Sequence, residues 1–222
     1  MKRLLSSRQC LWFALVLACA VSIGLYLSGA MRNHSEDFWY LAPNLGLAFI
    51  PLLLAIWLQS LLRRQAWKSP LPLIITLLLI LFLPNSFYVV SDFIHLQEIP
   101  RIDIVQDVVM LAQFSFTGLA FGFISLFILH QELLKRVSER IASTVIATLL
   151  LLSSFAIYLG RDLRWNSWDI AVQPFTLVSD VVRRLLDPFA YPETFTITFS
   201  FFVMLGSMYI VLWQAKRLFS EK

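Results

Sequence analysis

Six long apolar runs follow one another along this chain of 222 residues. A helix needs roughly 20 apolar residues to cross the ~30 Å hydrocarbon core of a bilayer, and each run is about that long. The runs do not alternate between apolar and polar residues, as the shorter strands of a membrane β-barrel would. The sequence therefore predicts an all-α, polytopic membrane helix bundle that forms a single domain over residues 1–222. The expected spans are about 9–30, 41–62, 71–92, 107–131, 141–160 and 193–213.

The composition of the chain supports this prediction. Hydrophobic residues make up 59% of it and charged residues 14%, whereas a soluble domain is about half apolar and a quarter charged. Cys10 and Cys19 lie nine positions apart in the first run, which puts them on opposite faces of a helix and too far apart for a disulfide. We therefore expect two unpaired thiols and no redox chemistry.

Charged residues are distributed unequally between the two sides of the predicted bundle. If the amino terminus is cytoplasmic, the inner segments carry twelve of the eighteen basic residues, including every lysine, and the outer segments carry eleven of the fourteen acidic residues. The positive-inside rule then places both termini in the cytoplasm. The net charge of +4 follows from this sidedness and does not indicate nucleic-acid binding. The first run is longer than a signal peptide needs, so we expect an uncleaved first helix.

A polar stripe interrupts the third apolar run. In the segment LFLPNSFYVVSDFIHL it consists of Asn85, Tyr88, Asp92 and His95, whose spacings of three, four and three place them on one face of a helix. Polar residues at the outer ends of other spans, Asn44 and Asp107 among them, lie at the same predicted depth. The sequence therefore predicts one outward-facing polar region built from several helices.

Three roles are open for this stripe. Asp92, His95 and Asp107 are residue types that bind zinc or manganese. Asp92 and His95 could instead form a catalytic acid–base pair. In the third alternative, the stripe only caps a kink at Pro84 and lies among the lipid headgroups. The inner halves of the spans hold few polar residues, which disfavours an ion pathway through the bundle.

A second polar group, GRDLRWNSWD, follows the fifth span. Arg161 and Arg164 lie one turn apart, and the planar guanidinium group pairs well with phosphate or carboxylate. The two arginines could hold an anionic headgroup, or they could pair with nearby aspartates and only stabilise the fold. Asn166 and Asp169 fit an N-cap and its acidic N3 position. The candidate ligand-binding residues are Asn44, Asn85, Tyr88, Arg161, Arg164, Asn166 and Asp169.

Two further patterns concern packing. Residues 174–189 carry apolar and charged side chains on opposite sides, which predicts an amphipathic helix that lies on the outer leaflet and covers the polar region. Gly118 and Gly122 form a GxxxG pattern in the fourth span, which indicates close packing against another helix.

The motifs LPNSFYVVSDFIHL and GRDLRWNSWD, together with NLGLAFIP from Asn44 to Pro51, resemble the bacterial membrane proteins grouped as domain of unknown function 1361. The resemblance covers roughly Asn44 to Asp169. It implies a multi-pass protein of the bacterial plasma (inner) membrane, and it implies no activity. The family pattern falls on Asn44, Pro84, Asn85, Tyr88, Asp92, His95, Asp107, Gly160, Arg161, Arg164, Asn166, Ser167, Trp168 and Asp169.

Three functions are compatible with these patterns. The first is binding or processing of an anionic lipid or lipid-linked headgroup at the outer membrane face, with the two arginines holding the anion and Asp92 and His95 orienting it or moving a proton. The second is a non-catalytic scaffold or assembly protein, in which the polar residues hold the helices together. The third is a small-solute transporter. The chain has no Walker, dinucleotide, HExxH or GxSxG motif, so it indicates neither a cofactor nor a reaction, and the oligomeric state stays open.

Overall fold

Helices make up nearly all of the described chain. The computed structural model describes residues 7–33, 38–97, 104–165 and 169–220, and helices are the only regular secondary structure within these ranges. Six of the described helices are long and apolar enough to cross a membrane, in agreement with the predicted spans. They are α1 (Ser7–Asn33), α2 (Leu41–Leu61), α3 (Pro70–Tyr88), which a short 3₁₀ helix extends, α4 (Ile104–Leu134), α5 (Glu139–Asp162) and α8 (Pro192–Ser220).

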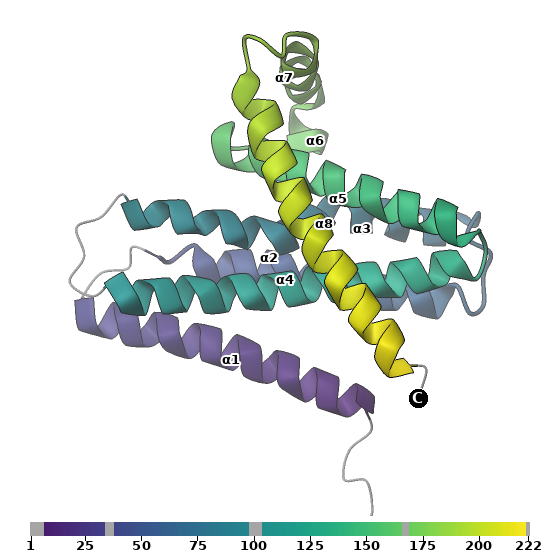
Figure 1. Cartoon of the computed structure of the whole chain (residues 1–222), viewed down its shortest axis with the longest axis horizontal. Coiled ribbons are helices and arrows are strands. Elements are labelled where there is room, and N and C mark those ends of the chain that lie inside the picture. Colours follow the sequence, from purple (N-terminus) through teal and green to yellow (C-terminus); the bar gives the residue numbers. More distant parts are fainter. Residues whose placement is uncertain (1–6, 34–37, 98–103, 166–168, 221–222) are drawn as a thin grey trace, which may run out of the picture.

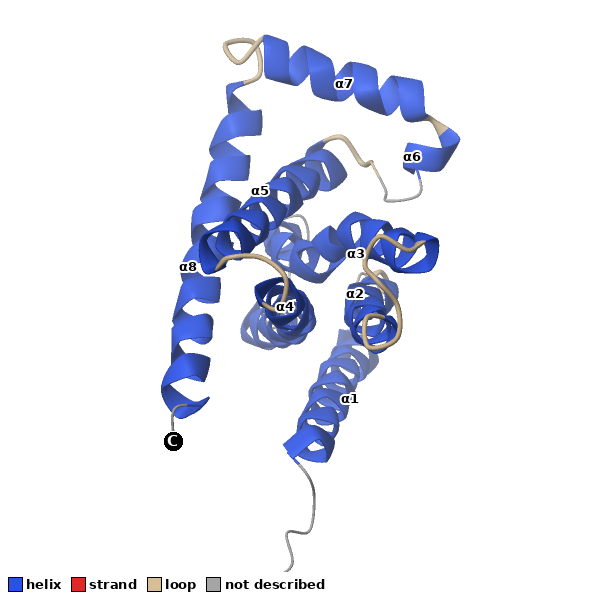
Figure 2. Ribbon diagram, turned by 90° about the vertical axis from the view of Figure 1, so that its right-hand side faces the viewer, coloured by secondary structure: helices blue, strands red, loops and turns tan. Residues whose placement is uncertain are grey.

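The helices α1 to α5 run side by side, and α8 crosses them on one flank (Figure 1). The centre consists of α2, α3 and α4, because α2 packs against both of the others. The outer positions belong to α1, which packs on α4, and α8, which packs on α5 (Figure 2). The beginning of α1 and the end of α8 share one end of the bundle (Figure 1). We call it the inner end, following the predicted orientation, and the opposite end the outer end.

The central helices α3 and α4 approach each other closely at two glycines of α4. A Cβ atom added to Gly122 would lie 2.5 Å from the Phe87 ring, and one added to Gly118 would lie 2.8 Å from the Ser86 carbonyl oxygen. These distances leave no room for a side chain, so the predicted role of the two glycines in close helix packing is confirmed. The Ser86 hydroxyl also donates to the Ala48 carbonyl at 2.7 Å, which joins α3 to α2.

Polar side chains join α1 to α4, although only 11% of the residues in the α1 span are buried. The hydroxyl oxygens of Ser22 and Thr117 lie 3.1 Å apart, and the Gln113 amide donates to the Ala18 carbonyl at 3.3 Å. Hydrocarbon offers these groups no alternative partner, so such bonds hold a peripheral helix in place. Both cysteines of α1 are free, as predicted.

The inner end of the bundle contains a buried carboxylate. Glu132 is only 3% exposed and accepts hydrogen bonds from Lys135, from Arg136 at 2.9 Å and from the Gln59 amide at 3.4 Å. The Arg136 guanidinium also lies 5.2 Å from the centre of the Trp67 ring. Because Gln59 belongs to α2 and Trp67 to the turn after it, this cluster joins α2 to the end of α4. Glu132 lies just beyond the predicted span 107–131, and its burial was not predicted from the sequence.

Candidate functional site

A cavity of about 440 Å³ lies at the outer end of the bundle. Its walls come from α2, α3, α5, the 3₁₀ helix η1 (Val89–Gln97), α6 (Asp169–Val172) and α7 (Pro174–Leu186). The polar and aromatic lining residues are Tyr40, Asn44, Asn85, Tyr88, Asp92, His95 and Trp165. The other lining residues are Leu47, Leu81, Pro84, Ala156, Leu159, Gly160, Ile170 and Leu177. Polar groups from distant parts of the sequence therefore converge on one space.

All four residues of the predicted polar stripe line this cavity. Asn85 and Tyr88 lie in the last turn of α3, and Asp92 and His95 lie in η1. A 3₁₀ helix has three residues per turn, so residues three apart share a face. The prediction of a single α-helix through the whole stripe is therefore wrong beyond Tyr88, but the change of helix type keeps the four side chains on a common side.

Side-chain bonds to the backbone support this change of helix type. The Asn85 amide donates to the Phe82 carbonyl at 3.1 Å, beside Pro84, which has no amide hydrogen of its own. The Ser91 hydroxyl donates to the Tyr88 carbonyl at 2.7 Å. Carbonyl groups near the end of α3 thus find donors within the bundle, which membrane-embedded backbone requires.

Asp92 is the carboxylate within the cavity wall, and it is only 2% exposed. Its carboxylate accepts a hydrogen bond from the Asn44 side chain and lies within electrostatic reach of His95. The Asp92 Oδ2 atom is buried and has no hydrogen-bond partner among the described residues. A buried acceptor without a donor costs free energy. An O–H or N–H group of a ligand would therefore gain most by binding at this oxygen.

Aromatic rings complete the polar side of the cavity. The rings of Tyr40 and His95 lie 5.1 Å apart, tilted by 56°. The Tyr88 ring packs on the backbone of α5 at Gly160, where an added Cβ would lie 3.2 Å from the ring. The sequence analysis did not assign Tyr40 to the site. Its position one helical turn before Asn44 was the signal that both side chains share a face.

A sharp turn after α5 brings Trp165 into the cavity wall. Arg164 adopts a left-handed backbone conformation, with φ at 57°. The backbone N–H of Trp165 donates to the Leu159 carbonyl at 3.2 Å, which folds the turn back onto the helix. The Trp165 indole Nε1 then donates to the Asp180 carboxylate of α7 at 3.1 Å. The turn therefore ties α7 to the cavity.

The predicted amphipathic helix forms as α7, and it ends at Leu186, before the predicted residue 189. Its polar side turns towards the bundle, because Arg184 donates to the Tyr158 hydroxyl of α5 at 3.3 Å. Leu177 lines the cavity, and α7 runs crosswise to α8 (Figure 2). Apolar side chains point outward, with Phe175 90% exposed. The helix thus borders the cavity through Leu177, and its position on the outer leaflet stays a prediction.

The two arginines of the second motif do not line the cavity. The Arg161 guanidinium lies 3.4 Å from the Asp162 carboxylate and is close enough to act electrostatically on the Tyr88 hydroxyl. The Arg164 side chain is exposed. Arg161 therefore lies near the rim of the cavity, and the two arginines form no anion clamp inside it.

The other predicted site residues lie apart from the cavity or outside the described residues. Asp169 begins α6 and Asp107 is buried in the first turn of α4, and neither lines the cavity. Asn166, with its predicted role as an N-cap, lies outside the described residues. Within the described ranges, no three His, Cys, Asp or Glu side chains group as a metal site would require. Asp92, His95 and Asp107 therefore do not assemble into the predicted set of metal ligands.

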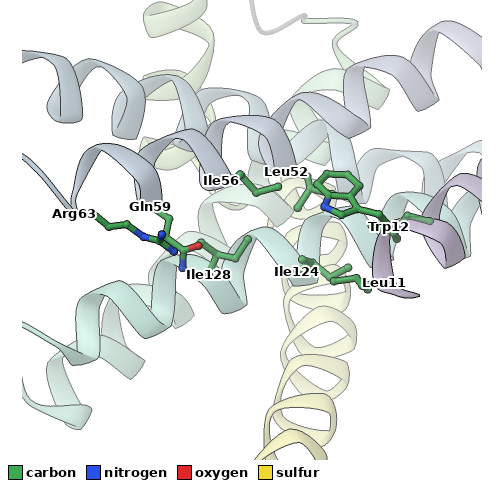
Figure 3. Close-up of a pocket in the computed structure, with 9 residues that line it drawn as sticks. Leu11, Trp12, Leu52, Ile56, Gln59, Arg63, Ile124 and Ile128 are labelled. Carbon is green, nitrogen blue, oxygen red and sulfur yellow. The ribbon is translucent and has the colours of Figure 1, made fainter. Parts of the chain in front are cut away.

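Two further cavities in the described part of the chain lie at the inner end. One, of about 250 Å³, lies between α1, α2 and α4, with Gln59 and Arg63 next to each other on one side and Trp12 on the other (Figure 3). The other, of about 330 Å³, lies between α5 and α8 and includes His130 and Tyr209. The sequence analysis predicted neither cavity. For the cavity between α5 and α8, the available signal in the sequence was His130, a histidine at the end of an otherwise apolar run.

Neither a curated protein nor a solved structure matches the chain. A family profile does match, over residues 43–208, which include nearly all of α2, the whole of α3 to α7 and more than half of α8. Every residue of the polar stripe and of the arginine motif falls inside this range, whereas α1 lies outside it. The chain therefore belongs to the membrane protein family described as protein of unknown function (DUF1361).

Proposed function

We propose that the protein binds the polar headgroup of a lipid or lipid-linked molecule in the outer cavity, at the outer face of a bacterial plasma membrane. The observation that carries this proposal is the convergence of Asn44, Asn85 and Asp92 on a space whose remaining walls are aromatic on the polar side and aliphatic elsewhere. An amphiphile presents polar and apolar surface together, and this cavity offers matching surfaces for both.

The polar groups inside the cavity favour a headgroup that carries hydroxyl groups. The Asp92 carboxylate accepts hydrogen bonds, and the amides of Asn44 and Asn85 both donate and accept them. The described lining residues include no lysine or arginine, so an anionic group placed deep in the cavity would lie beside the Asp92 carboxylate, with the His95 imidazole as the one cation-forming side chain in the described wall. The hydroxyl groups therefore belong inside, with Asp92 Oδ2 as their acceptor.

An anionic group of the same ligand belongs at the rim. Arg161 lies there beside Asp162, and both side chains of this pair are partly exposed. Exposed ion pairs stabilise a fold by only about 0 to 1 kcal/mol, so Arg161 can exchange Asp162 for a phosphate at little cost. Phosphatidylglycerol has two headgroup hydroxyls at the end of its headgroup and a phosphate next to them. Its hydroxyls could therefore lie inside the cavity while its phosphate lies at the rim.

Binding is the activity that we propose, with Asp92 and His95 orienting the hydroxyl group. The described lining residues include no Ser, Thr, Cys or Lys that could attack a phosphate or an ester. A catalytic acid–base pair would need such a nucleophile, or a bound water, to complete a reaction.

The second candidate is a non-catalytic scaffold in which the polar cluster only holds the helices together. Two hydrogen bonds favour it, from Trp165 to Asp180 and from Arg184 to Tyr158, because they join α7 to the turn after α5 and to α5 itself. The third candidate, a small-solute transporter, has less support. Fully buried apolar side chains, including Leu79, Phe121 and Leu126, fill the bundle.

Native mass spectrometry of the wild type and Asp92→Asn tests the proposal. The probes are phosphatidylglycerol, phosphatidic acid, which lacks the hydroxyls, and a glucosyl diacylglycerol, which lacks the phosphate. Asparagine keeps an acceptor oxygen, so Asp92→Asn loses the difference between a charged and a neutral hydrogen bond, about 1 to 1.5 kcal/mol, and should weaken phosphatidylglycerol binding by about five- to tenfold. Phosphatidic acid binding should change little. The control Asp187→Asn removes a carboxylate outside the cavity and should match the wild type.

Thermal unfolding of the same variants separates the two candidates. Under the binding proposal, Asp92→Asn keeps the wild-type melting temperature, because the carboxylate mainly serves the ligand. Under the scaffold alternative, it lowers the melting temperature and no lipid is preferred. Equal binding of all three lipids by wild type and variant would exclude the outer cavity as a headgroup site.

A further inference from the structure

The cavity between α5 and α8 has an aliphatic body. Ile146 and Leu150 of α5 face Phe202 and Ile210 of α8 across it. Gly206 also lines this space, and a Cβ atom added there would have no neighbour within 4 Å. Two membrane-spanning helices thus leave between them a space that is lined by apolar atoms and is wide enough for hydrocarbon. A lipid chain suits such a space better than water does.

The inner mouth of this cavity carries one charge of each sign. Glu139, in the first turn of α5, pairs with Arg217, in the last turn of α8, at 2.8 Å. Both side chains line the cavity and remain substantially exposed, at 63% and 49% respectively. A pair of this kind stabilises the fold little. Each partner can therefore turn to a ligand charge of the opposite sign.

A buried histidine lies at the level between the charged mouth and the aliphatic body. His130 is 2% exposed, its Nδ1 lies 2.7 Å from the Tyr209 hydroxyl, and its ring stacks on Trp213 at 4.2 Å. The other ring nitrogen, Nε2, is buried and has no hydrogen-bond partner among the described residues. When Tyr209 donates to Nδ1, Nε2 carries the proton and needs an acceptor. The ester carbonyl of a glycerolipid is such an acceptor.

From these three features we propose that the α5–α8 cavity binds an inner-leaflet phospholipid whose headgroup combines a phosphate with a primary amine. Its phosphate meets Arg217, its ammonium meets Glu139, and one acyl chain lies along Gly206. A purely anionic headgroup would leave Glu139 beside a like charge, and a choline headgroup has no N–H to donate to that carboxylate. The cavity of Figure 3 differs, because Arg63 is its charged lining residue.

Filling the cavity is the direct test, and Gly206→Leu places a side chain there at a position where an added Cβ meets no neighbour within 4 Å. Gly24→Leu is the matched control, since Gly24 in α1 is exposed and also has no neighbour within 4 Å of an added Cβ. Binding of phosphatidylethanolamine, phosphatidylcholine and phosphatidylglycerol is measured by native mass spectrometry. We expect Gly206→Leu to lower phosphatidylethanolamine binding at least about tenfold, and Gly24→Leu to match the wild type.

A second pair of variants tests the headgroup chemistry. Glu139→Gln should reduce the preference for phosphatidylethanolamine over phosphatidylcholine, whereas Arg63→Gln, at the other inner cavity, should leave that preference unchanged. His130→Phe keeps a stacking ring, removes the N–H donor and should weaken binding of both phosphatidylethanolamine and phosphatidylcholine at this cavity. Phosphatidylethanolamine binding that survives Gly206→Leu, or a Gly206→Leu effect equal for all three lipids, would overturn the proposal. Phosphatidylglycerol binding that depends on Asp92 belongs to the outer cavity and should be insensitive to Gly206→Leu.

Discussion

The indole Nε1 of Trp165 donates to the Oδ2 atom of Asp180 over 3.1 Å, and this bond joins the wall of the outer cavity to α7. Asp180→Ala removes the acceptor and leaves the indole N–H without its partner. The bond contributes about 1.5 kcal/mol, at the low end for a charged acceptor, because the Asp180 side chain is 32% exposed. Amide hydrogen exchange in α7 should therefore become faster. The neighbouring exposed variant Ser179→Ala should exchange like the wild type, and equal rates in all three proteins would contradict this link.

Gly122→Ala should destabilise the centre of the bundle. The added Cβ would lie 2.5 Å from the Phe87 ring, which is fully buried and has no space to retreat into. Overpacking of this kind costs about 1 to 3 kcal/mol. The matched variant Gly46→Ala meets nothing within 4 Å and should be neutral or slightly stabilising. Unfolding in mixed detergent measures both, and Phe87→Leu should recover part of the loss in Gly122→Ala if the ring is the obstacle.

Arg164 is the position at which glycine should be preferred over other residues. Its φ of 57° is a left-handed conformation that costs most residues about 1 to 2 kcal/mol but costs glycine little. Arg164→Gly should therefore raise the melting temperature, and Arg164→Val should lower it. Weaker binding of an anionic lipid by the more stable Arg164→Gly would show that the guanidinium group serves a ligand. A lower melting temperature in Arg164→Gly would show instead that the side chain stabilises the turn.

Glu132→Ala should destabilise the inner end more than a surface carboxylate does. The variant removes the acceptor shared by Lys135, Arg136 and Gln59. We expect a loss of about 2 kcal/mol, below the value for a fully buried pair because the Lys135 and Arg136 side chains are 60% and 32% exposed. Glu139→Ala breaks an exposed pair and should cost less than about 1 kcal/mol. Similar losses in both unfolding experiments would refute the role of burial.

The helices and the polar stripe could be predicted from the sequence because hydropathy and spacing decide them locally. Apolar runs of membrane-spanning length must form helices, since lipid offers the backbone no other partners. The common face of the stripe was predicted correctly although the helix type was not, because residues three apart, such as Asp92 and His95, share a face in an α-helix and in a 3₁₀ helix. The Ser115 hydroxyl of α4 donates to the Val89 carbonyl at 3.3 Å, where η1 begins. A contact between residues so far apart in sequence leaves no local signal.

The features that the sequence did not predict depend on contacts between residues that lie far apart in the sequence. The sequence HQELLKR at the end of α4 has the composition of a segment at the membrane surface, yet His130 and Glu132 are both buried. Their burial depends on partners from α8 and α2, namely Tyr209 and Gln59. Likewise, the left-handed conformation at Arg164 interrupts the helical path after α5, whereas a continuous ideal helix would place Arg161 and Arg164 on one side.

The unequal burial of the helices has a consequence for biosynthesis. Of the six spans, α4 has the lowest hydropathy and the largest buried share, 56%, whereas only 11% of α1 is buried. During synthesis α1 emerges before the other five spans, so its hydropathy of 2.3 favours entry into the bilayer without their contacts. When α4 follows with its buried hydroxyl groups, Ser22 of α1 is already in place to meet Thr117. The order of the helices along the chain thus places the span of lowest hydropathy after α1, α2 and α3, three of the helices that contact it, and before α5, which also packs on it.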